Sequence, residues 1–182
     1  MTGALSADER RQLLTAARQA IGDALAGKRI QPLSIEGAFG RRAGIFVSLH
    51  KHGDLRGCIG YPSGGEPLGA SVGECAVAAA TGDPRFPRVT PSELADLDIE
   101  ISVLTPIEPL VDPSDIVIGR DGLVIEHQQR RGLLLPQVAT EYGWDRDTLL
   151  RQLCLKAGLA RDAWKLGARL FRFEAEVFGE RE

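Results

Sequence analysis

Two segments of this chain alternate strictly between apolar and polar residues, and this period of two constrains the fold more than any other feature. Ile99, Ile101 and Val103 are the apolar members over residues 98–104, and residues 171–177 repeat the pattern. Successive side chains of a strand point to opposite faces, so this alternation is typical of a strand with one buried face. Both segments are therefore predicted to be half-buried strands.

A β-hairpin is predicted over residues 43–61, within the same sheet as the 171–177 strand. Residues 43–50 and 55–61 form its strands, and residues 51–54 form the turn. Pairing centred on the turn joins residues whose numbers sum to 105, so that Leu49 faces Arg56, Val47 faces Cys58, and no histidine shares the face of the thiol. A one-residue bulge at the turn would change which residues of the two strands share a face. Further strands are predicted at 115–119, 122–127 and 131–135.

Helices are predicted between these strands. The first covers residues 6–26, where Ser6 and Glu9 form a capping box and Gly27 is a stop signal. The others are expected at 67–80, 136–142 and 145–157. Because strands and helices follow no regular βαβ order, the fold class is predicted to be α+β, with a mixed sheet flanked by helices.

The composition favours one globular domain, which we place at residues 6–178. The chain has 182 residues, is 43% hydrophobic and has a formal net charge of −3. This charge argues against nucleic acid as a partner, since such proteins usually carry a basic excess. No apolar run reaches the length of a membrane span, and the first residues do not resemble a secretory signal. We therefore expect a cytoplasmic protein without a membrane partner, whose three cysteines are free thiols.

The strongest candidate site is the hexapeptide Leu-Arg-Gly-Cys-Ile-Gly at residues 55–60. In a regular strand Arg56 and Cys58 share a face, and a cation beside a cysteine favours the nucleophilic thiolate. Gly57 and Gly60 let a ligand or another backbone approach closely. Cys58 is therefore the candidate catalytic thiol, with Arg56 as a candidate substrate-binding residue. A buried, purely structural thiol is the alternative.

Two further segments carry candidate residues. Asp-Pro-Arg-Phe-Pro at 83–87 is stiffened by its prolines, so Arg85 is a candidate for binding an anionic substrate. In the alternative, Phe86 fills a gap in the core while Asp83 pairs with Arg85. Glu126 ends an apolar strand and is either a general base or the first solvated residue of that strand.

Metal and cofactor sites are not predicted. His50 and His52 flank the hairpin turn, but their spacing to Cys58 matches no zinc motif. Cys75 and Cys154 fall in the apolar phase of predicted helices and are expected to be buried. We name no cofactor and expect no metal.

Ordered blocks along the chain resemble the AMMECR1 domain family, specifically its prokaryotic AmmeMemoRadiSam system protein A branch. The resemblance covers residues 6–178, and its blocks are residues 55–60, 83–87, 99–106, 119–126, 131–139, 143–145 and 153–159. Arg88 departs from the family pattern, which usually has a second proline there. The resemblance implies a larger and a smaller subdomain, and an association with Memo-like and radical SAM proteins.

Two functions are compatible with these residues. In the first, the protein is an enzyme that acts on a small anionic molecule, with Cys58 as nucleophile or thiol acid/base, Arg56 beside it, Arg85 orienting the substrate and Glu126 nearby. In the second, it is a non-catalytic binding or scaffold module whose arginines anchor a ligand or a partner protein.

Overall fold

The computed structural model describes residues 4–181 of the chain. Its contacts divide the chain into two compact units, a larger one of residues 1–103 and 176–182 and a smaller one of residues 104–175. We call them unit 1 and unit 2. The α+β class and the division into a larger and a smaller part agree with the sequence-based expectation.

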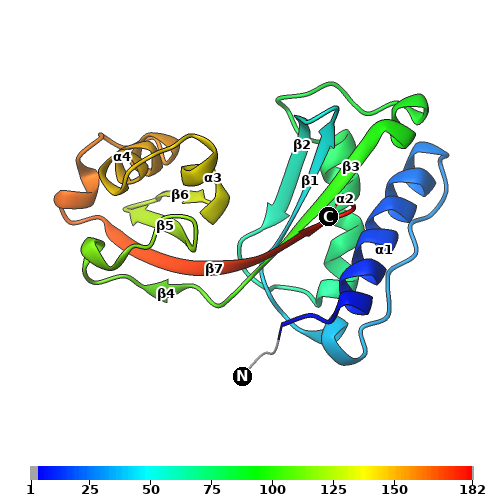
Figure 1. Cartoon of the computed structure of the whole chain (residues 1–182), viewed down its shortest axis with the longest axis horizontal. Coiled ribbons are helices and arrows are strands. Elements are labelled where there is room, and N and C mark those ends of the chain that lie inside the picture. Colours follow the sequence, from blue (N-terminus) through cyan, green and yellow to red (C-terminus); the bar gives the residue numbers. More distant parts are fainter. Residues whose placement is uncertain (1–3, 182) are drawn as a thin grey trace. The chain divides into compact units, whose positions relative to one another are not determined.

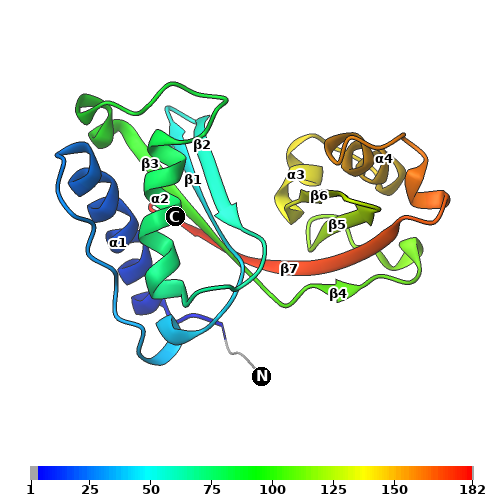
Figure 2. The ribbon, with the colours of Figure 1, turned by 180° about the vertical axis from the view of Figure 1, so that it is seen from behind.

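Unit 1 is a three-stranded antiparallel sheet extended by the end of the last strand and covered by two helices on one face (Figures 1 and 2). The strand order is β2-β1-β3 followed by β7, so β2 is an edge strand. Its elements are α1 (Ala7–Leu25), η1 (Gly37–Gly40), β1 (Ile45–Lys51), β2 (Asp54–Tyr61), α2 (Leu68–Thr81), η2 (Pro91–Asp96), β3 (Leu97–Leu104) and the end of β7 (Arg169–Gly179).

The core of unit 1 lies between the helices and one face of this sheet. Ile45, Val47 and Leu49 of β1 point into it and are fully buried, as is Leu13 of α1. Helix α2 approaches β2 closely, because a Cβ at Gly57 would lie 2.1 Å from the Ala79 carbonyl oxygen. The other face of the sheet, which the even-numbered residues of β1 occupy, is the face away from the helices.

The hairpin forms as expected, but part of its predicted register is wrong. His50 pairs with Leu55 as predicted, whereas Leu49 pairs with Gly57, and Val47 pairs with Ile59. The register shifts between Leu49 and His50, which leaves Arg56 as the extra residue of a β-bulge. A bulge within a strand depends on long-range packing and left no local signal in the sequence.

Unit 2 is an antiparallel sheet packed against two short helices. Strand β5 lies between β6 and β7, and β4 pairs with the other edge of β7. Its elements are β4 (Glu108–Pro109), η3 (Pro113–Asp115), β5 (Asp121–His127), β6 (Arg130–Leu134), α3 (Pro136–Glu141), α4 (Arg146–Lys156) and η4 (Ala163–Lys165), with the first part of β7. Leu123, Ile125 and Leu170 of the sheet pack with Leu150 and Leu153 of α4.

One predicted strand of unit 2 is absent. Residues 115–119, expected to be extended, form the end of a 3-10 turn and a loop. The Asp121 carboxylate accepts a hydrogen bond from the Val117 backbone N–H at 2.9 Å and draws this loop into a turn. The named strand pairings of both units are antiparallel, which refines the mixed sheet that was expected.

Candidate functional site

The Cys58 side chain lies in a row of polar residues that crosses three strands of unit 1. Ser48 of β1 is opposite Cys58 of β2 on one side and opposite Glu100 of β3 on the other. We call these three residues the Cys58 row. The Ser48 hydroxyl is buried and donates a hydrogen bond to the Cys58 sulfur at 3.2 Å, while Cys58 itself is partly exposed. The row occupies the sheet face away from the helices, so the thiol is outside the apolar core.

The backbone of Cys58 is bound by the loop of residues 83–87. Its N–H donates to Asp83 Oδ2 at 2.9 Å, and its carbonyl oxygen accepts from Arg85 Nη2 at 3.3 Å. Because β2 is an edge strand, these two groups have no strand partner on that side. The two side chains of the loop therefore replace the hydrogen bonds of a missing neighbouring strand.

Asp83 and Arg85 also pair with each other, as one of the two sequence-based alternatives predicts. Arg85 Nε and Nη2 donate to the two carboxylate oxygens of Asp83 at 3.0 and 2.7 Å. Asp83 is 2% exposed and Arg85 is 57% exposed at the side chain. The Arg85 guanidinium holds the pKa of Asp83 well below its usual range, and Asp83 in turn raises the pKa of Arg85. Phe86 is partly buried, with its ring 5.4 Å from the Arg85 guanidinium carbon.

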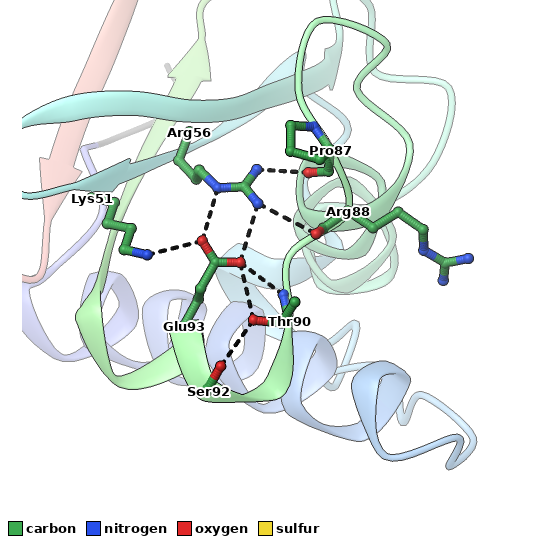
Figure 3. Close-up of polar contacts among 7 residues, drawn as sticks. All are labelled: Lys51, Arg56, Pro87, Arg88, Thr90, Ser92 and Glu93. Carbon is green, nitrogen blue, oxygen red and sulfur yellow. Dashed lines mark hydrogen bonds and ion pairs between the residues drawn. The ribbon is translucent and has the colours of Figure 1, made fainter.

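Arg56 lies in a separate cluster centred on Glu93 (Figure 3). Its Nε and Nη2 each donate to one Glu93 oxygen at 3.2 Å, and its Nη1 and Nη2 also donate to the carbonyl oxygens of Pro87 and Arg88. Lys51 donates to the same carboxylate at 3.0 Å. Arg56 is only 13% exposed and Glu93 17%. We call Lys51, Arg56, Thr90 and Glu93 the Glu93 cluster.

The expectation that Arg56 and Cys58 share a face is wrong. Arg56 and Lys51 both donate to Glu93, so their side chains lie on the same face of the sheet. Lys51 is an odd number of residues from Ser48 along β1, so this face is opposite to that of the Cys58 row. The bulge at Arg56 is the physical reason, since an inserted residue reverses the sidedness of the residues after it. For the same reason Leu55 shares a face with Cys58.

The bulge also changes which other residues share the face of the thiol. His50 was expected on the opposite face, but it lies two residues from Ser48 on the same face of β1. It is opposite Leu55 and Asp98, one row away from Cys58.

Glu93 is held as a carboxylate by the groups around it. Arg56 contributes most, and the Thr90 backbone N–H, which donates at 2.9 Å, and Lys51 contribute less. Together they hold the pKa of Glu93 well below its usual range. A charged, multiply bonded carboxylate at this position fixes the 87–93 segment to strand β2.

Glu126 belongs to unit 2, whereas Cys58, Arg56 and Arg85 belong to unit 1. It lies on β5 opposite Arg131 and Arg169 in the two neighbouring strands. Its carboxylate accepts from Arg169 at 2.9 Å and forms an ion pair with Arg131 at 3.4 Å. Glu126 is therefore the centre of a cross-strand ion-pair network of its own unit.

The remaining cysteines are buried in the cores of the two units. Cys75 is 1% exposed and Cys154 is 0% exposed, and all three cysteines are free thiols. Burial raises the pKa of the Cys75 thiol to about 12, and burial also raises the pKa of Cys154. Over residues 4–181, no three His, Cys, Asp or Glu side chains are grouped so that they could hold a metal ion. No helix in that range is long and apolar enough to cross a membrane.

Three residues of this region were not predicted from the sequence. Ser48 and Glu100 have no local sequence signal for a site, and only the pairing of β1 with both neighbours places them in one row with Cys58. Glu93 had a local signal, because Thr90 and Glu93 have the spacing of a capping box.

Comparison with known proteins identifies the family. The AMMECR1 family model matches residues 14–178. A protein of Methanothermobacter thermautotrophicus is 51% identical over 97% of this chain and 96% of its own length, and one of Methanocaldococcus jannaschii is 48% identical over 91% and 87%. Neither name assigns an activity. The crystal structure of an uncharacterized Pyrococcus horikoshii protein superimposes with a TM-score of 0.88 at 40% identity, over 93% of this chain and 90% of that one. The chain belongs to the AMMECR1 family.

Proposed function

We propose that this protein is an enzyme that acts on a small anionic molecule, with Cys58 as its nucleophile or thiol acid/base. The observation that carries the proposal is the hydrogen bond from the Ser48 hydroxyl to the Cys58 sulfur at 3.2 Å. A donor aimed at sulfur stabilises the thiolate, which is the reactive form of cysteine. A thiol that only filled space in a core would be surrounded by apolar groups, as Cys75 and Cys154 are.

Glu100 is the acid/base candidate within the same row. It lies opposite Ser48 on β3, and directly opposite side chains of antiparallel strands have Cβ atoms about 4.5–5.5 Å apart. When the Cys58 sulfur bonds to an electrophilic carbon, the S–H bond breaks, and a leaving group or a carbonyl oxygen takes up the electron pair displaced from that carbon. Glu100 is separated from Cys58 by Ser48, and we propose that it accepts the thiol proton through the Ser48 hydroxyl. We assign the base role to Glu100 rather than to Glu126, because Glu100 belongs to the Cys58 row, whereas Glu126 lies in unit 2 among its own arginine partners.

Arg85 is the proposed anion-binding residue. Its Nε and Nη2 bond to Asp83 and to the Cys58 carbonyl oxygen, yet its side chain is 57% exposed. The Asp83 contacts hold the guanidinium in a fixed pose next to the backbone of the catalytic residue, which suits it to orient a substrate carboxylate or phosphate. Arg56 has its donors bound to Glu93, Pro87 and Arg88, so we propose a positioning role for it.

A non-catalytic binding or scaffold module is the second candidate. It is favoured by the fact that Arg56 and Arg85 both bond to groups of this chain and thereby fix residues 83–93 along β2. The resemblance to the AmmeMemoRadiSam branch supports a cytoplasmic pathway role with Memo-like and radical SAM proteins. That association is compatible with either candidate.

The two candidates differ in how Cys58 reacts with charged and neutral electrophiles. We compare alkylation of the folded protein by iodoacetate and by iodoacetamide, each rate normalised to that of glutathione. In both reagents the sulfur bonds to the methylene carbon as iodide leaves, and only iodoacetate carries an anion. We expect a normalised preference for iodoacetate of about three- to tenfold, the size of one hydrogen bond at a partly exposed site.

Substitutions test whether Arg85 causes the preference for iodoacetate. Arg85→Gln should abolish it, Arg85→Lys should keep part of it, and Arg88→Gln should leave it unchanged, because the Arg88 side chain points away from the Glu93 cluster (Figure 3). Equal normalised rates for the two reagents in the wild-type protein would overturn the anion site. Absence of any Cys58 alkylation in the folded protein would overturn the enzyme proposal and favour the scaffold module.

A further inference from the structure

A second arginine-rich region surrounds the buried Asp121 in unit 2. Asp121 accepts hydrogen bonds from the Val117 backbone N–H at 2.9 Å and from Arg120 Nε and Nη2 at 2.7 and 3.0 Å. Its side chain is 1% exposed, while that of Arg120 is 47% exposed. The turn at residues 119–122 therefore holds the Arg120 guanidinium in one place at the protein surface.

A hollow of about 320 Å³ opens beside this pair. It lies wholly within unit 2 and is lined by Thr105, Pro106, Glu108, Arg120, Asp121, Arg172, Phe173 and Glu174. Its volume is at the lower end of the range typical of ligand sites, about 300–1,000 Å³. We call it the Arg172 hollow.

Arg172 distinguishes this hollow from the rest of the surface. It is partly buried on β7, yet its side chain makes no hydrogen bond and no ion pair within residues 4–181. Within the same range, the other arginines without such a contact, such as Arg88 and Arg161, are exposed to solvent. Partial burial weakens the hydration of a guanidinium, so an unpaired one gains more from an incoming anion than a fully hydrated one does.

Carboxylates lie near Arg172 without bonding to it: Glu108 is its cross-strand neighbour on β4, and Glu174 forms an ion pair with Arg120 at 3.5 Å. Burial tends to raise the pKa of Asp121, but Arg120, the Val117 N–H and Arg172 outweigh it, and the net shift is downward. The Asp121 carboxylate is thus charged, and its hydrogen bonds go to Arg120 rather than to Arg172. Thr105 adds a donor, because its hydroxyl oxygen accepts the Glu174 N–H at 2.8 Å and its hydrogen remains available.

We propose that the Arg172 hollow binds a small molecule with a single carboxylate, which would lie between Arg172 and Arg120. The carboxylates of Glu108 and Glu174 also line the hollow. They disfavour ligands with several negative charges, and they can accept hydrogen bonds from an ammonium or hydroxyl group next to the ligand's carboxylate. The ligand class is therefore a small carboxylic acid with an adjacent donor group, such as an amino acid.

This site is independent of the proposed function. It contains none of Cys58, Ser48 or Arg85, which belong to unit 1. Its test therefore uses binding rather than any reaction of the thiol, so that either proposal can fail alone.

The test is an NMR titration of the full chain with glycine, acetate and pyrophosphate as separate probes. We expect shifts of the amide signals of residues 120–122 and 172–174, with glycine binding most tightly, acetate less tightly and pyrophosphate least. Arg172→Gln should weaken glycine binding by about tenfold or more, the loss of one charge-assisted contact. Arg161→Gln, which removes an exposed arginine of the same unit, should leave it unchanged.

A second variant tests the role of the glutamates that line the hollow, and its result does not depend on that of the first variant. Glu174→Gln should reduce the preference for glycine over acetate and improve the binding of pyrophosphate. Far-ultraviolet circular dichroism verifies that each variant is folded. The proposal is overturned if no probe shifts these signals, or if Arg172→Gln binds glycine as the wild type does. Tightest binding of pyrophosphate by the wild type would overturn the proposed ligand class.

Discussion

The Glu93 cluster and the Cys58 row begin two residues apart on strand β2 and differ in how their polar groups are used. In the cluster, the Arg56 donors bond to Glu93 and to two backbone carbonyls, and Arg56 is 13% exposed. In the row, the partly exposed Cys58 sulfur accepts one hydrogen bond, from Ser48. A buried polar group whose hydrogen bonds are all made within the chain stabilises the fold. A polar group at the surface with a single hydrogen bond is available for chemistry.

The Arg172 hollow extends the same contrast to a second arginine. Arg56 and Arg172 are both partly buried, yet Arg56 bonds to several acceptors and Arg172 bonds to none within residues 4–181. Residue type and burial are alike in the two cases. The two residues differ in how many acceptors the guanidinium bonds to, and this difference is why we propose a structural role for Arg56 and a binding role for Arg172.

The largest expected effect is on stability in the Glu93 cluster. Arg56→Ala leaves the Glu93 carboxylate and two carbonyl oxygens without their main donor, and we expect it to lower the free energy of unfolding by about 2–4 kcal/mol. Urea unfolding measures this value. Arg88→Ala is the matched control, because only the carbonyl oxygen of Arg88 takes part in the cluster, and it should cost less than about 0.5 kcal/mol. Equal losses in the two variants would contradict the structural role of Arg56.

The second expected effect is a loss of stability in acid. The folded-state pKa of Glu93 lies below its ordinary value of 4.5 and that of Asp83 below its ordinary value of 3.8. The unfolded chain therefore binds more protons, and the stability that these groups contribute is full above the ordinary values and declines as the pH falls below them. Urea midpoints measured from neutral pH downward track this decline.

Two variants make the acid test specific. Glu93→Gln removes one of the carboxyl groups whose pKa is lowered and should flatten the fall in stability below the ordinary pKa of that group. Glu141→Gln removes an exposed carboxylate on helix α3, and its stability should decline at acid pH as that of the wild type does. If stability declines in the same way at acid pH in all three proteins, Arg56 does not hold Glu93 as a carboxylate.

The smallest effect is expected in the Cys58 row. Ser48→Ala removes the hydrogen bond to sulfur, and we expect it to slow alkylation of Cys58 by about three- to tenfold. The change should cost only about 0.5–1.5 kcal/mol of stability. Ser102→Ala is the matched control, since it removes a buried hydroxyl on the same sheet face but opposite Phe46. A rate that is equal in both variants and the wild type would show that the Ser48 hydroxyl does not act on the thiol.

Local signals in the sequence predicted much of the fold. Helix α1 begins after Ser6 with the expected capping box, because the Ser6 and Glu9 groups involved are within one turn of each other. The alternating segments form β3 and β7. Strand β7 does not keep the single buried face that was expected, because Val177 is exposed and its neighbour Phe178 is buried. The two-residue turn at His52 and Gly53 also obeys local rules, as both residues have a positive φ.

The arrangement of the candidate site depends on contacts that are distant along the chain. Arg56 and Glu93 are separated by 37 residues, and the bulge that accommodates their contact reverses the expected face of Arg56. Ser48 and Glu100 share a row with Cys58 only because of the register of three strands. The pairing of Asp83 with Arg85 could be anticipated, because these residues are two apart in a proline-stiffened loop.

The central claim is that Cys58, unlike its neighbour Arg56, is available for chemistry, and the alkylation rates of the three cysteines test it most directly. Mass spectrometry of the folded protein after timed exposure to iodoacetamide near neutral pH gives each rate separately. We expect Cys58 to react faster than glutathione, and Cys75 and Cys154 to react only after unfolding, because they are 1% and 0% exposed. A Cys58 that reacts no faster than glutathione, or is as protected as the other two, would contradict the account.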